Sequence, residues 1–239
     1  MSGRGSVLVT RPEPEARRTA EKLAALGWQP IVAPLMVAQA MPDSPPMTGF
    51  DAVAMTSARA VEYMRAADRA ALADLPAFAV GARTADAMRS AGFRHVASAD
   101  GDVTALAALI AGSGMKAGGR VAHIGGQDRA GDLSGLVAIS GIKVETIAVY
   151  RMAPVTELPE IAHRALEDGS IVAIVHYSPR SAEIFRDLIC ADRLIGAAAR
   201  ARHVCLSSQV AEPLRTVFGA TITIAREPNE PSLLEALGA

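Results

Sequence analysis

Short apolar runs alternate with longer segments of helical periodicity along most of this chain. The first run, Val7–Thr10, precedes a segment in which Ala16, Ala20 and Leu23 share one helix face. Gly27 follows that segment and is expected to end the helix, as glycine does at the C′ position. Regular alternation of strand and helix is typical of parallel strands joined by right-handed crossovers. The pattern therefore predicts an α/β protein.

The number of predicted strands exceeds what one small sheet holds. Strand-like runs are found at 7–10, 30–35, 51–55, 77–80, 95–97, 120–124, 143–150, 171–177, 203–206 and 221–225. Proline-bearing segments interrupt the pattern at 41–49 and at Pro154. We therefore expect the 239 residues to form two α/β domains.

An internal similarity supports two related halves. Thr56–Glu62 resembles Tyr177–Glu183, and each follows a predicted strand and opens a helix. Val80–Ala85 and Leu206–Ala211 lie one strand–helix unit later in their respective halves. Two similar pairs in the same order suggest duplicated units. Chance similarity between short segments rich in Ala, Ser and Arg is the alternative.

Composition excludes several classes of function. The chain has 24 Lys+Arg against 25 Asp+Glu and only 4% aromatic residues, which argues against a general nucleic-acid binder. No apolar run reaches the length of about 18 residues that a membrane span needs, and residues 1–6 lack a signal-peptide pattern. Two cysteines fit neither a disulfide framework nor a metal cluster. We therefore expect a cytoplasmic protein that binds neither membranes nor nucleic acid.

The candidate binding residues lie where predicted strands end. In open parallel sheets, ligands bind beyond the carboxyl ends of the strands, and the free N–H groups of a following helix favour an anion. The small and polar residues at these positions are Thr10, Arg11, Thr56, Ser57, Gly81, Gly125, Gly126, Ser178, Ser207 and Ser208. Simple helix capping is the alternative at each position. The recurrence in both halves favours an anion-binding cleft.

Arginines and one tyrosine add to this set. Arg11, Arg59, Arg83 and Arg180 follow predicted strand ends, where a guanidinium can hold a carboxylate with two parallel N–H bonds. Solvated arginines at helix starts are the alternative. Tyr150 ends a strand just before the second proline junction, where its phenol could face the space between domains or pack in the hinge.

Signatures of several other chemistries are missing from the sequence. It contains neither of the glycine-rich phosphate-binding motifs G-x-x-x-x-G-K-[ST] and G-x-G-x-x-G, and it has no G-x-S-x-G nucleophile elbow. The histidines lack metal-ligand spacing, which favours structural roles; they are His95, His123, His163, His176 and His203. The sequence therefore predicts no metal site.

Taken in order, several segments resemble the uroporphyrinogen-III synthase family. The resemblance rests on Val7–Pro12, Thr56–Val61, Val80–Ala85, Val144–Tyr150 and Tyr177–Ser181, and it covers most of the chain. It implies two flavodoxin-like doubly wound parallel-sheet domains joined by a two-stranded linker. One domain would be discontinuous, from 1–37 and 153–239, the other would be 42–149, and the linkers would be 36–42 and 150–155.

The resemblance also implies an activity. The family cyclises hydroxymethylbilane, a linear tetrapyrrole with eight carboxylates, to uroporphyrinogen III with inversion of ring D and loss of water. It implies a cofactor-free monomer, and a transient contact with the preceding pathway enzyme is plausible. A non-catalytic two-domain protein that binds a small anion is the main alternative, and a regulatory sensor domain is another.

The family's functional residues map onto few positions. Its candidate tyrosine falls on Tyr150, and a threonine in its first-half glycine loop falls on Thr84. Where the family often has a Gly-x-Thr-Thr segment, this chain has Ser207–Val210, so a hydroxyl role for that pair of threonines does not transfer. Pro213 falls close behind this segment, where it is expected to distort the helix start.

Overall fold

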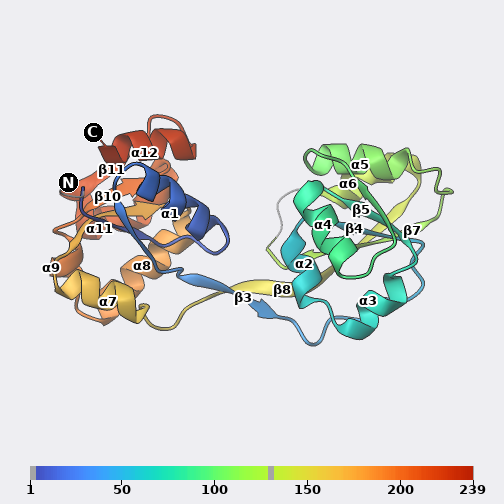
Figure 1. The fold of residues 1–239 in the computed structure, drawn as a ribbon, viewed down its shortest axis with the longest axis horizontal. Helices are drawn as coiled ribbons and strands as arrows, with labels where there is room; N and C mark the ends of the chain where they lie inside the picture. The colour runs from blue at the N-terminus through green and yellow to red at the C-terminus, as the bar shows by residue number, and fades with distance from the viewer. Residues whose placement is uncertain (1–3, 129–131, 239) are drawn as a thin grey trace. The chain divides into compact units, whose positions relative to one another are not determined.

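The computed structural model describes residues 4–128 and 132–238, and it confirms an α/β protein with two parallel-dominated sheets (Figure 1). The chain divides into unit 1, Met1–Val37 with Ala153–Ala239, and unit 2, Ala38–Met152. It passes between the units within β3 (Met36–Ala40) and β8 (Lys143–Pro154), which are neighbouring strands. These two strands run antiparallel, because the N–H of Met41 bonds the carbonyl of Val149 and the N–H of Val155 bonds that of Leu35.

Unit 1 is built on a five-stranded parallel sheet. Its strands are β1 (Ser6–Val9), β2 (Gln29–Val32), β9 (Ile171–His176), β10 (Arg202–Cys205) and β11 (Ile222–Ile224). Their spatial order is β2-β1-β9-β10-β11, which is the flavodoxin order 2-1-3-4-5 within the unit. The strand order therefore reverses between β1 and β9, and this is where such folds place a ligand.

Helices cover both faces of this sheet, so its strands are apolar on both sides. Val7 and Val9 pack toward α1 (Glu15–Ala25) and α12 (Glu230–Gly238) (Figure 1). Leu8 faces the opposite way, toward a core that contains Phe185. The helices on that side are α7 (Glu160–Glu167), α8 (Pro179–Ala191), α9 (Ile195–Ala198), α10 (Ser208–Ala211) and α11 (Arg215–Phe218).

Unit 2 has a six-stranded sheet in the order β3-β8-β7-β4-β5-β6. The remaining strands are β4 (Ala52–Met55), β5 (Pro76–Ala79), β6 (His95–Ser98) and β7 (Arg120–Gly126). Apart from β3, the strands are parallel and have the order 3-2-1-4-5 within the unit, so this sheet reverses between β4 and β7.

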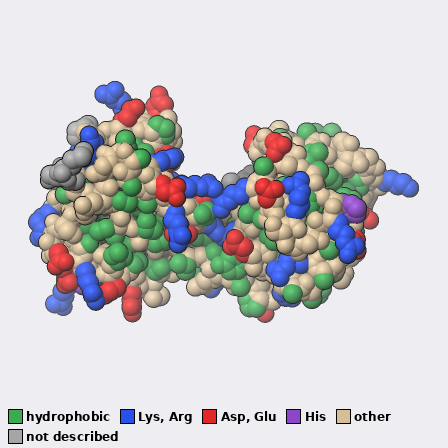
Figure 2. All heavy atoms as spheres, in the orientation of Figure 1, with side chains coloured by type: hydrophobic (Ala, Val, Ile, Leu, Met, Phe, Trp, Pro, Cys, Tyr) green, Lys and Arg blue, Asp and Glu red, His purple; other side chains and the backbone are tan. Residues whose placement is uncertain are grey.

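The helices of unit 2 also form two layers (Figure 1). One layer holds α2 (Ala58–Tyr63), α3 (Ala66–Leu72) and α4 (Ala82–Ser90), and the other holds α5 (Val103–Ala111) and α6 (Leu133–Val137). Met55 packs with Met88 in the first layer, and Ala54 packs with Leu106 in the second. The face in view carries acidic and basic side chains interspersed on each unit, as near-neutral composition implies (Figure 2).

Local signals in the sequence have the expected effects. Gly27 follows α1 with φ +84°, and the side chain of Asp102 accepts from the N–H groups of Thr104 and Ala105 at the start of α5. Pro213 falls in a 3₁₀ turn, Glu212–Leu214, that separates α10 from α11, so the irregularity lies after α10 and not at its start, which Ser207 caps. The apolar pattern of the sequence did not predict strand β3, because it is a mostly exposed edge strand without apolar alternation; only the family resemblance implied a strand there, in the two-stranded linker.

Candidate functional site

A β-bulge sets the position of Tyr150 in unit 2. Gly125 of β7 pairs with Ala148 of β8, but Gly126 pairs with Tyr150, so Val149 is an extra residue in β8. The N–H of Gln127 donates to the Tyr150 carbonyl at 2.8 Å and closes the bulge. Bulges of this kind redirect a side chain at the end of a strand. The Tyr150 side chain is thereby brought to the carboxyl edge of the sheet, next to the end of β7.

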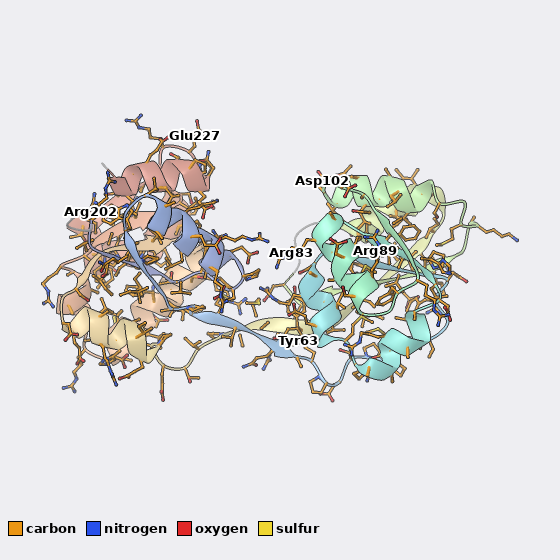
Figure 3. The ribbon with its side chains drawn as sticks, viewed as in Figure 1. Tyr63, Arg83, Arg89, Asp102, Arg202 and Glu227 are labelled. Carbon is orange, nitrogen blue, oxygen red and sulfur yellow. The ribbon has the colours of Figure 1, made fainter. Side chains whose placement is uncertain are left out.

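The ring of Tyr150 is tightly enclosed and only 8% of the residue is exposed. The ring of Tyr63, at the end of α2 (Figure 3), lies 5.5 Å away between centroids, and the Arg59 guanidinium carbon lies 5.7 Å from the Tyr150 ring centre. A Cβ on Gly126 would come within 2.8 Å of two ring carbons. Gly126 is therefore required for the close approach of this ring.

Polar side chains form a row beneath the same edge. His123 on β7 is 3% exposed, and its two ring nitrogens lie 3.4 Å from the hydroxyl oxygens of Thr56 and Thr146. A Cβ on Gly125 would meet nothing nearer than His123 Nε2 at 3.9 Å. Thr56, at the end of β4, is therefore linked to a buried histidine rather than being an isolated surface hydroxyl.

The helix starts that follow β4 and β5 differ in their capping. The Ser57 hydroxyl accepts from the N–H of Arg59 at 3.2 Å, so this side chain caps α2. Gly81 precedes α4 without any side-chain cap, and its carbonyl accepts from Thr84, which is 5% exposed. Among the described residues, none accepts from the N–H groups of Ala82 and Arg83. The first turn of α4, from which Arg83 projects (Figure 3), therefore offers unused donors.

In unit 1 the predicted hydroxyl groups are mostly used internally. Thr10 is completely buried and donates to the carbonyl of Val175 at 3.2 Å. Ser178 and Ser207 accept from N–H groups of the helices that they cap, at 3.2 and 3.4 Å. Ser208 and Arg180 are exposed. The capping alternative is therefore observed for both cap serines, whose backbone groups still border the strand ends.

A charged cluster surrounds Arg11 at the point where the unit 1 sheet reverses. The carboxylate of Glu230, at the start of α12, accepts from Arg11 at 3.1 Å, from Thr19 at 2.6 Å and from Tyr177 at 3.0 Å, and it also bonds Lys22. The Arg11 guanidinium lies 4.0 Å from the centre of the Tyr177 ring. The sequence predicted Arg11 alone, because its partners lie up to 219 residues away along the chain.

The cluster has a defined protonation state. Burial raises the pKa of Glu230, but hydrogen bonds from Lys22, Thr19 and Tyr177 outweigh it and lower this pKa overall. Burial raises the pKa of Tyr177 to about 12. The carboxylate is therefore ionised and the phenol neutral, so that the phenol donates to the carboxylate.

Two further histidines lie in the core of unit 1, away from solvent. Nε2 of His176 is 3.1 Å from Nδ1 of His203, whose other nitrogen lies 3.2 Å from the Ala198 carbonyl. The rings of Phe185 and Phe218 pack around them. Within residues 4–128 and 132–238, no group of three His, Cys, Asp or Glu residues could hold a metal ion.

Comparison with known proteins gives the family. The sequence profile of the family described as uroporphyrinogen-III synthase HemD matches residues 17–235. The chain belongs to the uroporphyrinogen-III synthase family. The enzymes of this family cyclise hydroxymethylbilane. No curated protein sequence matches the chain significantly.

One solved structure that resembles this chain has the same fold. The enzyme described as uroporphyrinogen-III synthetase from Helicobacter pylori is 18% identical, with 98% of this chain and 99% of that chain covered and a TM-score of 0.58. A mutant uroporphyrinogen III synthase from Thermus thermophilus is 20% identical, covers 98% and 97%, and has a TM-score of 0.49. The helices of the described residues include none that could cross a membrane.

The predicted site residues fall into two groups, one at the strand ends of each unit. Those of unit 2 are Thr56, Ser57, Arg59, Gly81, Thr84, Gly125, Gly126 and Tyr150. Those of unit 1 are Thr10, Arg11, Ser178, Arg180, Ser207 and Ser208. Sequence reasoning missed Tyr63, Thr19 and Glu230, which reach these groups only through the tertiary fold.

Proposed function

We propose that this chain converts hydroxymethylbilane into uroporphyrinogen III, closing the macrocycle with inversion of ring D and loss of water. The observation that carries this function is the family match over residues 17–235. The two parallel sheets, with small and polar residues at their carboxyl edges, are suited to a large polycarboxylate.

The reaction needs an acid, a cavity of the right shape and few other groups. The hydroxymethyl group of the first ring accepts a proton and leaves as water, which produces a conjugated cation. The substituted carbon of ring D attacks that cation and forms a spiro intermediate, which fragments and recloses with ring D inverted and a proton lost. Electron-rich pyrroles drive these steps, so the main contribution of the protein is positioning.

Tyr150 is the proposed proton donor to the departing hydroxyl. Its ring is held by Tyr63, Arg59 and the close approach of Gly126, which gives the phenol a fixed position at the strand ends. We expect Tyr150→Phe to lower kcat by about tenfold or more, within the lower range of general acid catalysis. Unchanged kcat in a folded Tyr150→Phe variant would remove this tyrosine from the acid role.

Backbone amides and arginines are proposed to bind the carboxylates. The uncapped first turn of α4, after Gly81, supplies N–H donors, and Arg59 lies beside Tyr150. Each charge-assisted hydrogen bond contributes roughly 1.5–3 kcal/mol. Thr56, Ser57, Thr84 and Gly125 contribute shape and backbone groups in unit 2, and Ser178 does so in unit 1. Several such bonds acting together fix a flexible polyanion without a strongly basic surface.

The isomer of the product tests the function. The protein is incubated with freshly prepared hydroxymethylbilane, and the products are oxidised and separated as porphyrin isomers. Uroporphyrinogen III in excess over the spontaneous type I product is expected. Only type I product, with binding of the substrate but no turnover, would instead indicate a non-catalytic binding protein.

The proposal extends to the oligomeric state and the location of the enzyme. We propose that it acts as a monomer in the cytoplasm, with no more than transient contact with the enzyme that releases its unstable substrate. Light scattering during size-exclusion chromatography is expected to give a mass near 24.8 kDa. A stable dimer mass would contradict the monomer.

A further inference from the structure

The reversal point of the unit 1 sheet carries an arginine that is held on one edge and open on the other. Arg11 follows β1 and Tyr177 follows β9, the two strands between which the strand order reverses. Ligands of doubly wound sheets bind in the crevice outside this point. The side chain of Arg11 remains 22% exposed, so that it is neither fully buried nor fully solvated.

Toward the described residues, the Arg11 guanidinium donates hydrogen bonds from one nitrogen only. Nη1 donates to Thr19 Oγ1 and to Glu230 Oε1, both at 3.1 Å. The guanidinium plane packs on the Tyr177 ring at 4.0 Å. Across the described part of the chain, no group accepts from Nε or Nη2 of Arg11. Nε and Nη2 form one edge of the guanidinium, with the geometry that binds a carboxylate through two parallel bonds.

The charges of the cluster leave it attractive to an anion. Glu230 is shared between Arg11 and Lys22, so two cations face one carboxylate. Tyr177 is a neutral donor in this cluster. Glu230 therefore holds Arg11 in place without cancelling the positive charge of the site.

We propose that the Nε–Nη2 edge of Arg11 binds one carboxylate of the tetrapyrrole substrate and that Glu230 is the positioning residue for this arginine. This proposal rests on the proposed function. Glu230 acts through Arg11 and does not contact the substrate. Thr19 supports the arrangement, because its hydroxyl lies within hydrogen-bond distance of both Arg11 and Glu230.

A second reading of the cluster makes an opposite prediction. The Glu230 carboxylate could occupy the place of a substrate carboxylate and compete with it. Replacement of Glu230 by Gln would then tighten substrate binding. A positioning role predicts weaker binding, because the arginine loses its ionic partner and samples other rotamers.

The experiment compares four variants by steady-state kinetics with hydroxymethylbilane and by fluorescence titration with uroporphyrin III, a stable octacarboxylate. Arg11→Gln is expected to raise KM and the porphyrin Kd by about 10- to 100-fold, the loss of a bidentate charged contact. Arg11→Lys is expected not to restore binding, because an ammonium lacks the two-pronged edge. Glu230→Gln is expected to raise KM by about 3- to 10-fold with kcat unchanged.

The fourth variant and one substitute complete the test. Arg17→Gln removes an exposed ion pair between Arg17 of α1 and Glu13, which precedes that helix, and is expected to leave KM and kcat unchanged. If Glu230→Gln does not fold, Thr19→Val replaces it and is expected to raise KM in the same direction. Thermal unfolding of each variant shows that it is folded.

Several outcomes would overturn the proposal. Unchanged KM and porphyrin Kd in Arg11→Gln would remove Arg11 from binding, and a lower KM in Glu230→Gln would identify Glu230 as a competitor. If Arg11→Gln and Glu230→Gln lower the thermal midpoint equally and leave KM unchanged, the cluster has only a structural role. If the wild-type protein yields only type I product, the proposed function fails, whereas the porphyrin titrations still decide the role of Arg11.

Discussion

The buried histidine pair makes the stability of unit 1 depend on pH in mild acid. His176 and His203 are both fully buried, and Nδ1 of His176 has no hydrogen-bond partner among the described residues. Burial, reinforced by the neighbouring His203, lowers the pKa of His176 well below 6.5. Burial also lowers the pKa of His203 to about 4, against the opposing effect of its bond to the Ala198 carbonyl.

The size of the effect follows from the difference between folded and unfolded chains. An unfolded chain protonates these rings near pH 6.5, whereas the folded unit keeps them neutral to a much lower pH. The stability is therefore unaffected above about pH 7 and falls between pH 6.5 and 4. For His203, the gap between 6.5 and about 4 corresponds to about 3 kcal/mol, of which about 2 kcal/mol is lost by pH 5.

The single tryptophan reports on this unit. Trp28 lies in the core of unit 1, so its fluorescence follows the unfolding of that unit in urea. We expect the free energy of unfolding to fall by at least about 2 kcal/mol between pH 7.5 and 5.0. His203→Asn should reduce this dependence, because only His176 then contributes, and His163→Gln, at a partly exposed position, should leave it unchanged. Equal unfolding free energies of the wild type at both pH values would refute the reasoning.

Three backbone and capping changes test the remaining geometry. Gly81→Ala should leave stability unchanged, since no atom lies within 4 Å of the new Cβ and φ is −162°. It should raise KM about tenfold because the new methyl group keeps the substrate away from this backbone, and a KM equal to that of the wild type would exclude such an approach. Gly126→Ala should lower the free energy of unfolding by about 1–3 kcal/mol and lower kcat by displacing the Tyr150 ring, whereas Gly125→Ala should lower the free energy of unfolding less. Equal thermal midpoints of the two variants would contradict this packing. Asp102→Ala should lower the unfolding free energy by about 1 kcal/mol without changing kcat, which chemical denaturation and turnover assays can check.

The fold was largely predictable because its signals are local. Strands buried on both faces, such as Val7–Val9, give continuous apolar runs, and helix stops such as Gly27 act within one turn. The apolar pattern did not reveal strand β3, because an exposed edge strand needs no apolar face; only the family resemblance implied it. The number of sheets could be argued from the number of strands, but the strand order could not, since it depends on which distant segments pair.

The candidate sites were less predictable, because side-chain partners come from the tertiary fold. Arg11 could be placed at a strand end, but its bond to Glu230 links residues at opposite ends of the chain. Tyr150 was predicted to end its strand, but β8 continues to Pro154, and the bulge that turns the Tyr150 ring against Gly126 has no marker in the sequence. A serine such as Ser178 suits both a helix cap and a ligand-binding position, and its capping hydrogen bond depends on local geometry that the sequence does not determine.

The central claim is that the carboxyl edges of the two sheets bind the substrate carboxylates. Backbone amide shifts in a ¹⁵N-labelled sample titrated with uroporphyrin III test it most directly. The account predicts the largest shifts at Ala82 and Arg83 in the first turn of α4 and at Arg11 beyond β1, and small shifts at the opposite edge, near Gly49 and Gly118. Large shifts at Gly49 and Gly118, with Ala82 and Arg83 unmoved, would contradict it.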